Sequence, residues 1–265
     1  MFAVDRRIGL GVLVILVVAT PIAAVWVMNQ TPTEQPIVMK ITLLYNAGVM
    51  IEVGEARLYI DPVSLPGNYS DKPADVILIT HPHSDHYSGA AVSMLEKDST
   101  VIVFPENMSS AMGSLGGTGV NPGDNIVAGI FNITAFYMYT TAPEGYDPSH
   151  PPEANWTSYI IEFYGFTVFH AGDSKCIEEY EELTGKIDLA LLPLGPGCQT
   201  MADAEVVDAI EVIGPTYFIP IHYTEGADAT FIATYGDDVE AAGCEVVSLA
   251  YFHSREIQVA ALVVS

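Results

Sequence analysis

The chain has 265 residues and a net charge of −24, with nine lysines and arginines against 33 aspartates and glutamates. Half of the residues are hydrophobic, which is enough for a sizeable core in one large domain or two small ones. Nucleic-acid binding requires clustered lysine and arginine, so the charge argues against a nucleic-acid partner. It favours a small or neutral substrate, because a long anionic one would be repelled unless bound metal ions reversed the local field.

The N-terminus differs in composition from the rest of the chain. Residues 1–7 include Arg6 and Arg7, and residues 8–28 form an uncharged apolar run. Such a run can cross a hydrocarbon core of about 30 Å, and the positive-inside rule then places residues 1–7 in the cytoplasm. We expect a single-pass transmembrane anchor with the remainder outside the cytoplasm, joined by a polar linker over residues 29–38. A cleaved signal peptide, giving a secreted protein, is the alternative.

Glycosylation motifs point to the same location. Five of the eight asparagines stand in N-x-S/T motifs, namely Asn29, Asn68, Asn107, Asn132 and Asn155. We interpret this enrichment as a sign of an extracytoplasmic glycoprotein. The alternative is that the motifs are unused.

Residues 39–265 alternate short β-rich runs with helical ones. Three strand-like runs over residues 40–61 predict an antiparallel meander. The continuous apolar run of residues 75–80 predicts a strand buried on both faces. A helix follows over residues 88–97 with Ser88 at its N-cap, then a strand over residues 100–104 and a mostly loop-like segment.

The second half of this region repeats the pattern. The sequence predicts strand material over residues 125–139, a proline-rich loop over 142–156 and a hairpin around Gly165. Two helices ending at Gly185 and Gly214 then alternate with buried strands. A helix over residues 226–236 and strands over residues 245–251 and 256–264 complete the chain. Strands followed by strand–helix units in both halves predict two sheets with helices outside them.

The chemistry concentrates in "THPHSDHY", residues 80–87, which holds three of the seven histidines and one aspartate. This loop directly follows a predicted strand, and three further candidate ligands also lie at or beyond strands: His150, Asp173 and His222. Neutral imidazoles and carboxylates suit Zn²⁺ and similar ions. His81 and His83 can grip one ion, while Asp85 and His86 turn towards a second.

The motif resembles the H-x-H-x-D-H signature of the metallo-β-lactamase superfamily. Further segments resemble the UPF0173, ascorbate-6-phosphate lactonase-like branch of metal-dependent hydrolases, namely "MKITLLYNAGVMIE", "LYIDP", "VFHAGDS", "DLALLPLG" and "PIHY". The resemblance covers about residues 39–235. It implies an α+β fold, an αββα four-layer sandwich over residues 39–265, here preceded by the transmembrane helix.

The resemblance also implies a dinuclear centre. One metal ion would be held by His81, His83 and His150, and a second by Asp85, His86 and His222, with Asp173 bridging the two. Zn²⁺ is expected, with Mn²⁺ or Fe²⁺ as alternatives. Iron redox relatives usually carry glutamate where this chain has His83. Asn46 replaces a histidine usual in the family, and the loop "LGPGCQTM" departs in length, so substrate identity cannot be inherited.

Two-metal chemistry makes hydroxide available near neutral pH for attack on a carbonyl or phosphoryl centre. Asp85 would orient this hydroxide, and His170 and Tyr223 are candidate proton donors to the leaving group. We also interpret His170 as support for Asp173, and Asp61 as an acceptor for a ligand histidine.

We therefore expect a membrane-anchored metal-dependent hydrolase acting on a small ester, lactone or phosphodiester. One alternative is a phospholipase-like lipid hydrolase at the membrane surface. Another is a non-catalytic metal-binding envelope protein on the same fold. The sequence leaves the oligomeric state open.

Overall fold

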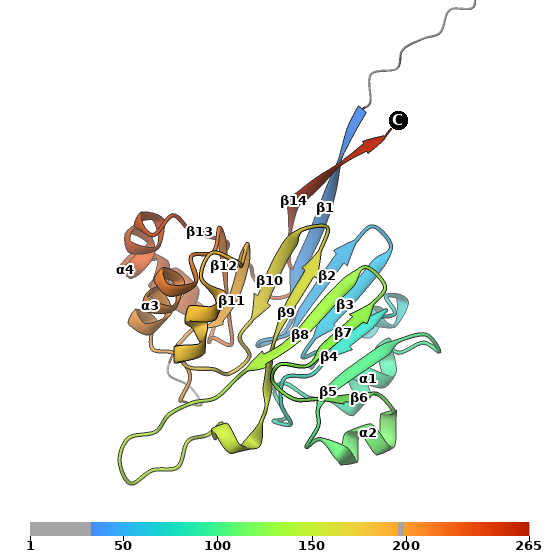
Figure 1. Cartoon of the computed structure of the whole chain (residues 1–265), viewed down its shortest axis with the longest axis horizontal. Helices are drawn as coiled ribbons and strands as arrows, with labels where there is room; N and C mark the ends of the chain where they lie inside the picture. The colour runs from blue at the N-terminus through green and yellow to red at the C-terminus, as the bar shows by residue number, and fades with distance from the viewer. Residues whose placement is uncertain (1–32, 196–198, 265) are drawn as a thin grey trace, which may run out of the picture.

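The computed structural model describes residues 33–195 and 199–264. Its strands form two seven-stranded sheets (Figure 1). The first sheet has the order β14-β1-β2-β3-β4-β5-β6. Its strands are β1 (Thr33–Leu43), β2 (Val49–Val53), β3 (Ala56–Ile60), β4 (Val76–Leu78), β5 (Val101–Pro105), β6 (Thr118–Val120) and β14 (Ser254–Val264).

The second sheet has the order β13-β12-β11-β10-β9-β8-β7. Its strands are β7 (Asn125–Ala128), β8 (Phe131–Tyr137), β9 (Thr157–Phe163), β10 (Phe166–His170), β11 (Leu189–Pro193), β12 (Tyr217–Ile221) and β13 (Glu245–Val246). In each sheet, antiparallel pairs give way to a run of parallel ones, β3 to β6 in the first and β10 to β13 in the second.

Hydrophobic clusters define four layers. The central cluster lies between the sheets and joins side chains such as Ile41 and Leu78 from one to Ile161 and Leu191 from the other. A second cluster packs the first sheet against α1 (Gly89–Leu95) and α2 (Ser109–Leu115). A third packs the second sheet against the 3₁₀ helix η3 (Glu178–Leu183), α3 (Asp203–Ile213) and α4 (Ala227–Ala241). Two short 3₁₀ helices, η1 (Gly67–Asp71) and η2 (Pro152–Ala154), complete the set. The predicted two-sheet α+β architecture is confirmed.

Local sequence explains these elements. The three residues of β4 are all buried, as the continuous apolar run requires of a central strand. Ser88 caps α1 by accepting a hydrogen bond from the Ala91 amide. Helix α3 buries a single apolar face and ends where Gly214 adopts a left-handed conformation with φ of 66°.

Four expectations need correction. The strand β1 begins at Thr33, so residues 33–38 belong to the first sheet rather than to a linker. Residues 178–183 form a 3₁₀ helix and not an α-helix, in a segment where successive glutamates repel one another. The loop-like segment after residue 105 contains α2 and the short edge strand β6. The strand predicted over residues 245–251 shrinks to Glu245–Val246.

The predicted transmembrane segment is not among the residues that the structure describes. Residues 8–28 lie outside the described residues, and no helix within the described ranges combines the length and apolarity needed to span a bilayer.

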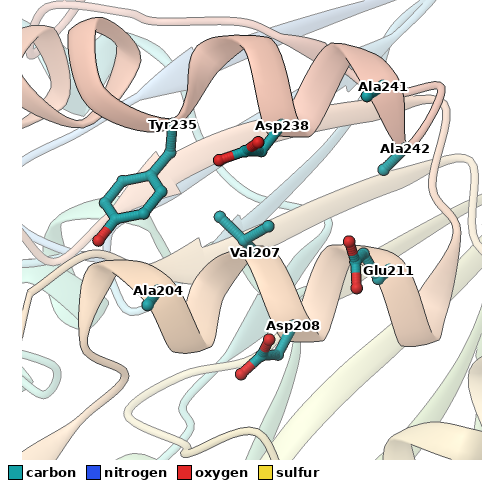
Figure 2. Close-up of a pocket in the computed structure, with 8 residues that line it drawn as sticks. All are labelled: Ala204, Val207, Asp208, Glu211, Tyr235, Asp238, Ala241 and Ala242. Carbon is teal, nitrogen blue, oxygen red and sulfur yellow. The ribbon is translucent and has the colours of Figure 1, made fainter.

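A groove separates α3 from α4, as Figure 2 shows. Val207 and Tyr235 line it together with the carboxylates of Asp208, Glu211 and Asp238. None of these residues is a candidate metal ligand, and no lysine or arginine is among the lining residues. The groove is therefore separate from the chemistry described below.

Candidate metal centre

All seven predicted ligands converge where the parallel strands end. The loop after β4 carries His81, His83, Asp85 and His86. Asp173 follows β10, and His222 directly follows β12. Because the carboxyl ends of parallel strands meet at one edge, strands from both sheets deliver these side chains to a single place.

Among the described residues, three groups of three have the spacing of metal ligands, and two of them are the predicted ligand sets. One combines His81, His83 and His150, with the Nε2 atoms of His81 and His150 3.3 Å apart. Within each group, one ligand atom from each residue lies within 4.8 Å of the others.

The other group combines Asp85, His86 and His222, with Nε2 of His222 3.4 Å from Oδ2 of Asp85. A further trio, Asp61 with His81 and His86, satisfies the same spacing, but Asp61 is engaged with the far side of His86.

Asp173 lies between the two groups. Its Oδ1 is 3.0 Å from Nε2 of His86, while its Oδ2 is 3.2 Å from Nε2 of His222 and 3.5 Å from Nε2 of His150. A carboxylate with both oxygens turned to different ligand groups is positioned to bridge two ions. The side chain is fully buried, so its charge requires partners.

Hydrogen bonds behind the histidines set their orientation. The buried carboxylate of Asp61 accepts from Nδ1 of His86 at 2.7 Å and from the Thr80 hydroxyl at 2.5 Å. Because that hydroxyl proton is used on Asp61, the Thr80 oxygen accepts from Nδ1 of His81 at 2.9 Å. Both histidines therefore present Nε2 to the centre, as metal-bound histidines usually do with a partner behind them. The expectation for Asp61 agrees with this geometry.

The centre leaves buried polar atoms without hydrogen bonds. Among the described residues, these include Nε2 of His86, Nε2 of His222 and both carboxylate oxygens of Asp173. Buried nitrogen and oxygen atoms normally have partners. Neutral imidazole nitrogens and a carboxylate converging in this way match the ligand set of Zn²⁺, Mn²⁺ or Fe²⁺. The residues present therefore fit a metal group.

The buried charged groups of the centre shift one another's pKa. Burial and the neighbouring histidines hold the pKa of His81 well below its ordinary value, and burial lowers the pKa of His150 to about 4. Burial also acts on His86, but the carboxylates of Asp173 and Asp61 outweigh it and raise the pKa of His86 to about 10. The imidazole of His222, whose Nε2 lies 3.4 Å from Oδ2 of Asp85, keeps the pKa of Asp85 below its ordinary range despite partial burial.

The backbone around the centre is held in unusual conformations. Asn46, Asp61 and His222 all have positive φ, at 59°, 46° and 53°. Such conformations are uncommon outside glycine and cluster at functional sites. Gly48 allows this packing, since a Cβ there would lie 2.9 Å from the carbonyl oxygen of Asp61.

The two candidate proton donors are engaged elsewhere. The fully buried His170 donates from Nε2 to the Ala47 carbonyl at 2.8 Å, and its Nδ1 accepts from the Gly172 amide at 3.1 Å. Its contacts fit a positioning role for the loop that carries Asp173. The Tyr223 hydroxyl donates to the Leu249 carbonyl at 2.9 Å, and burial raises its pKa. Neither group presents a free proton to the centre.

Sequence reasoning missed Trp156 as a neighbour of the ligands, and it marked Asn46 without its contact to Asp85. The Trp156 ring contacts His81, His83 and His150 with centroid separations of 5.1–5.5 Å, and its buried indole nitrogen has no partner. Asn46 donates from Nδ2 to the backbone and carboxylate oxygens of Asp85, each at 3.3 Å. The only available signal was the departure from histidine at residue 46; nothing marked Trp156.

A cleft of about 800 Å³ opens beside the second ligand group. Asn46 and His222 line its inner side, and Tyr45, Tyr223 and Tyr251 line much of the rest. Of the seven ligands, His222 lines this cleft, so a substrate bound there would lie beside the second ligand group.

The two sheets together supply a buried centre of histidines and aspartates that fits metal ions. The sequence profile of the β-lactamase superfamily domain matches residues 40–222. The chain belongs to this superfamily, and the predicted class, a metal-dependent hydrolase, is confirmed at the level of the family.

Relatives support the narrower resemblance. A UPF0173 metal-dependent hydrolase of Thermococcus kodakarensis is 31% identical over 198 residues, covering 70% of this chain and 84% of its own. Another from Thermococcus onnurineus is 34% identical with the same coverage. Among solved structures, a Parabacteroides distasonis protein named as a metal-dependent hydrolase has a TM-score of 0.70 and 29% identity, covering 82% of this chain and 98% of its own. The metallo hydrolase Igni18 of Ignicoccus hospitalis, at 22% identity and a TM-score of 0.68, covering 84% of this chain and all of its own, shares the fold.

Proposed function

We propose that the protein is a dinuclear metal-dependent hydrolase, using Zn²⁺, that cleaves a small ester, lactone or phosphodiester. The observation that carries this proposal is the position of Asp173, whose two oxygens face histidines of both ligand groups and have no other partner. When bound, paired divalent ions lower the pKa of water towards neutrality and stabilise charge that develops on the cleaved carbonyl or phosphoryl oxygen.

The chain's own residues prepare this site. His81, His83 and His150 would hold one ion, and Asp85, His86 and His222 the other, with Asp173 between them. Asn46 lines the cleft and donates to Asp85, which fixes the carboxylate of that ligand. The imidazole of His222 beside Asp85 lowers the pKa of Asp85, so the carboxylate is ionised and suited to hold a metal ion and orient a water molecule.

A panel of substrates tests the activity. The purified full chain, loaded with zinc, should hydrolyse at least one member of a series of esters, lactones, thioesters and phosphodiesters. The double variant Asp85→Ala, His86→Ala should lose this turnover, while Asp75→Asn on the protein surface should keep it. A metal-loaded protein inactive on the whole panel would favour the non-catalytic alternative.

We further propose that residues 8–28 anchor the enzyme in a membrane with the hydrolase domain outside the cytoplasm. The uncharged run and Arg6 and Arg7 before it support this. Asn68, Asn107, Asn132 and Asn155 are exposed and therefore accessible to glycosylation. Protease added to intact cells should digest the domain. A glycosidase should also lower its mass. Protection from protease, with no mass shift, would overturn the proposal.

A further inference from the structure

The cleft beside His222 has a wall of three tyrosines from distant parts of the sequence. The rings of Tyr45 and Tyr251 lie 5.4 Å apart at 48°, and those of Tyr223 and Tyr251 lie 6.0 Å apart at 26°. The Tyr251 hydroxyl donates to the Tyr223 carbonyl at 2.9 Å, and the Tyr223 hydroxyl donates to Leu249. Two rings are thus locked by backbone contacts, while Tyr45 remains 45% exposed.

The charged side chains that line the cleft are all negative. The carboxylates of Asp203 and Glu225 line it, and no lysine or arginine is among its described lining residues. The whole chain reinforces this field with its net charge of −24. An anionic group on a substrate would find no cation along this wall. A cation would find ring faces and carboxylates together, the combination that recognises ammonium and quaternary ammonium groups.

We propose that this cleft binds the cationic, non-reacting part of the substrate, an ammonium or quaternary ammonium group held against Tyr45 and Tyr251. Asn46 and His222 line the same cleft, so the scissile bond of a short ester would lie towards the second ligand group. The assignment of a substrate class rests on the proposed hydrolase function. The cation subsite itself does not, because its residues are not metal ligands.

Binding of tetramethylammonium tests the subsite without catalysis. Saturation-transfer NMR of the full chain, with and without metal, should show transfer to the methyl protons. Tyr45→Phe keeps the aromatic face and should keep the signal, whereas Tyr45→Leu and Glu225→Gln should weaken binding several-fold. Because Tyr45 is exposed and its side chain has no described hydrogen bond, both of its variants should fold. Equal binding by Tyr45→Phe and Tyr45→Leu would overturn the proposal.

Matched substrates test the class. Acetylthiocholine should be cleaved with a kcat/KM about tenfold above that of its neutral isostere, 3,3-dimethylbutyl thioacetate, as expected for a partly desolvated cation–π contact. Tyr45→Leu should reduce this ratio towards one, because it removes the ring face that favours the cation over its neutral isostere. A ratio of one in the unmodified protein would overturn the assignment. Tetramethylammonium binding without hydrolysis of any ester, lactone, thioester or phosphodiester of the panel would support the subsite and overturn the proposed hydrolase function instead.

Discussion

The Asp61 carboxylate lies 2.7 Å from Nδ1 of His86, on the side of the ring that faces away from the centre. Asp61 follows β3 and His86 lies beyond β4, two parallel neighbours in the first sheet. The contact fixes the ring so that Nε2 points at Asp173. A hydrogen bond between adjacent strand ends thus determines which nitrogen can hold a metal.

Asp61→Asn should weaken metal binding by about 10- to 100-fold, because the amide cannot polarise His86 as the carboxylate does. Competition with a chromophoric chelator measures the affinity. Asp75→Asn is the matched control, since Asp75 lies on the surface and pairs with Lys97 at 2.6 Å. Unchanged affinity in Asp61→Asn would show that the contact is incidental.

Asn46→Gly should lower kcat by about tenfold, because it removes a donor to an ionised carboxylate worth roughly 1.5 kcal/mol. Glycine tolerates the φ of 59° at this position, so the fold should be unaffected. Steady-state kinetics should place the loss in kcat more than in KM. A change confined to KM would mean that Asn46 contacts the substrate instead of orienting Asp85.

The metal-free protein should be most stable near neutral pH. Burial lowers the pKa of His150 to about 4, so the unfolded chain binds more protons between pH 4 and about 6.5, and stability rises with pH there. The carboxylates around His86 raise its pKa to about 10, so the folded state holds the extra proton above about pH 6.5. The free energy of unfolding should therefore fall between about pH 6.5 and pH 10. Thermal unfolding with a chelator present measures this curve.

Between about pH 6.5 and 8 the decline is specific to His86, because the thiols of Cys176 and Cys244, whose pKa burial also raises, contribute only above about pH 8.5. In His86→Asn the free energy of unfolding should be nearly flat between about pH 6.5 and 8. Adding metal to the unmodified protein should remove the decline as well, because metal displaces the His86 proton. An equally steep fall in the variant would assign the decline to another group.

Gly48→Ala should destabilise the protein by about 1–3 kcal/mol, since the added Cβ would meet backbone oxygens of Asp61 and Tyr45 at 2.9 and 3.0 Å. Thermal unfolding should shift down by several degrees. Gly67→Ala is the control, because a Cβ there has no neighbour within 4 Å. Equal melting temperatures for the two variants would contradict the predicted close approach.

The hydrophobic pattern of the sequence predicted the centre, because most of its ligands directly follow apolar strands. The carboxyl ends of such strands lie at one edge of a sheet. The motif of residues 80–87, Asp173 and His222 could be placed in this way from β-branched runs and spacing. His150 sits in an irregular loop, and only the resemblance marked it. The structure brings it to 3.3 Å from His81 through a turn that carries no periodic signal.

The tyrosine wall and Trp156 could not be predicted. Tyr45, Tyr223 and Tyr251 come from three loops, and an isolated tyrosine in a sequence is equally suited to the core or the surface. Their meeting depends on the backbone contact in which Tyr251 donates to the Tyr223 carbonyl. The sequence also did not predict the short strand β6, because a strand at the edge of a sheet requires only weak β-propensity.

Metal content tests the central claim most directly. The full chain, purified with metal supplied and exchanged into metal-free buffer, should retain two zinc ions per chain by elemental mass spectrometry. Asp85→Ala with His86→Ala should retain at most one, because the first group of ligands remains. Two ions in the wild type and a loss in this variant are the predicted result. A wild-type protein that retains no tightly bound metal would contradict the dinuclear centre. So would a wild-type protein that retains one ion, if the Asp173→Ala variant retains that ion too.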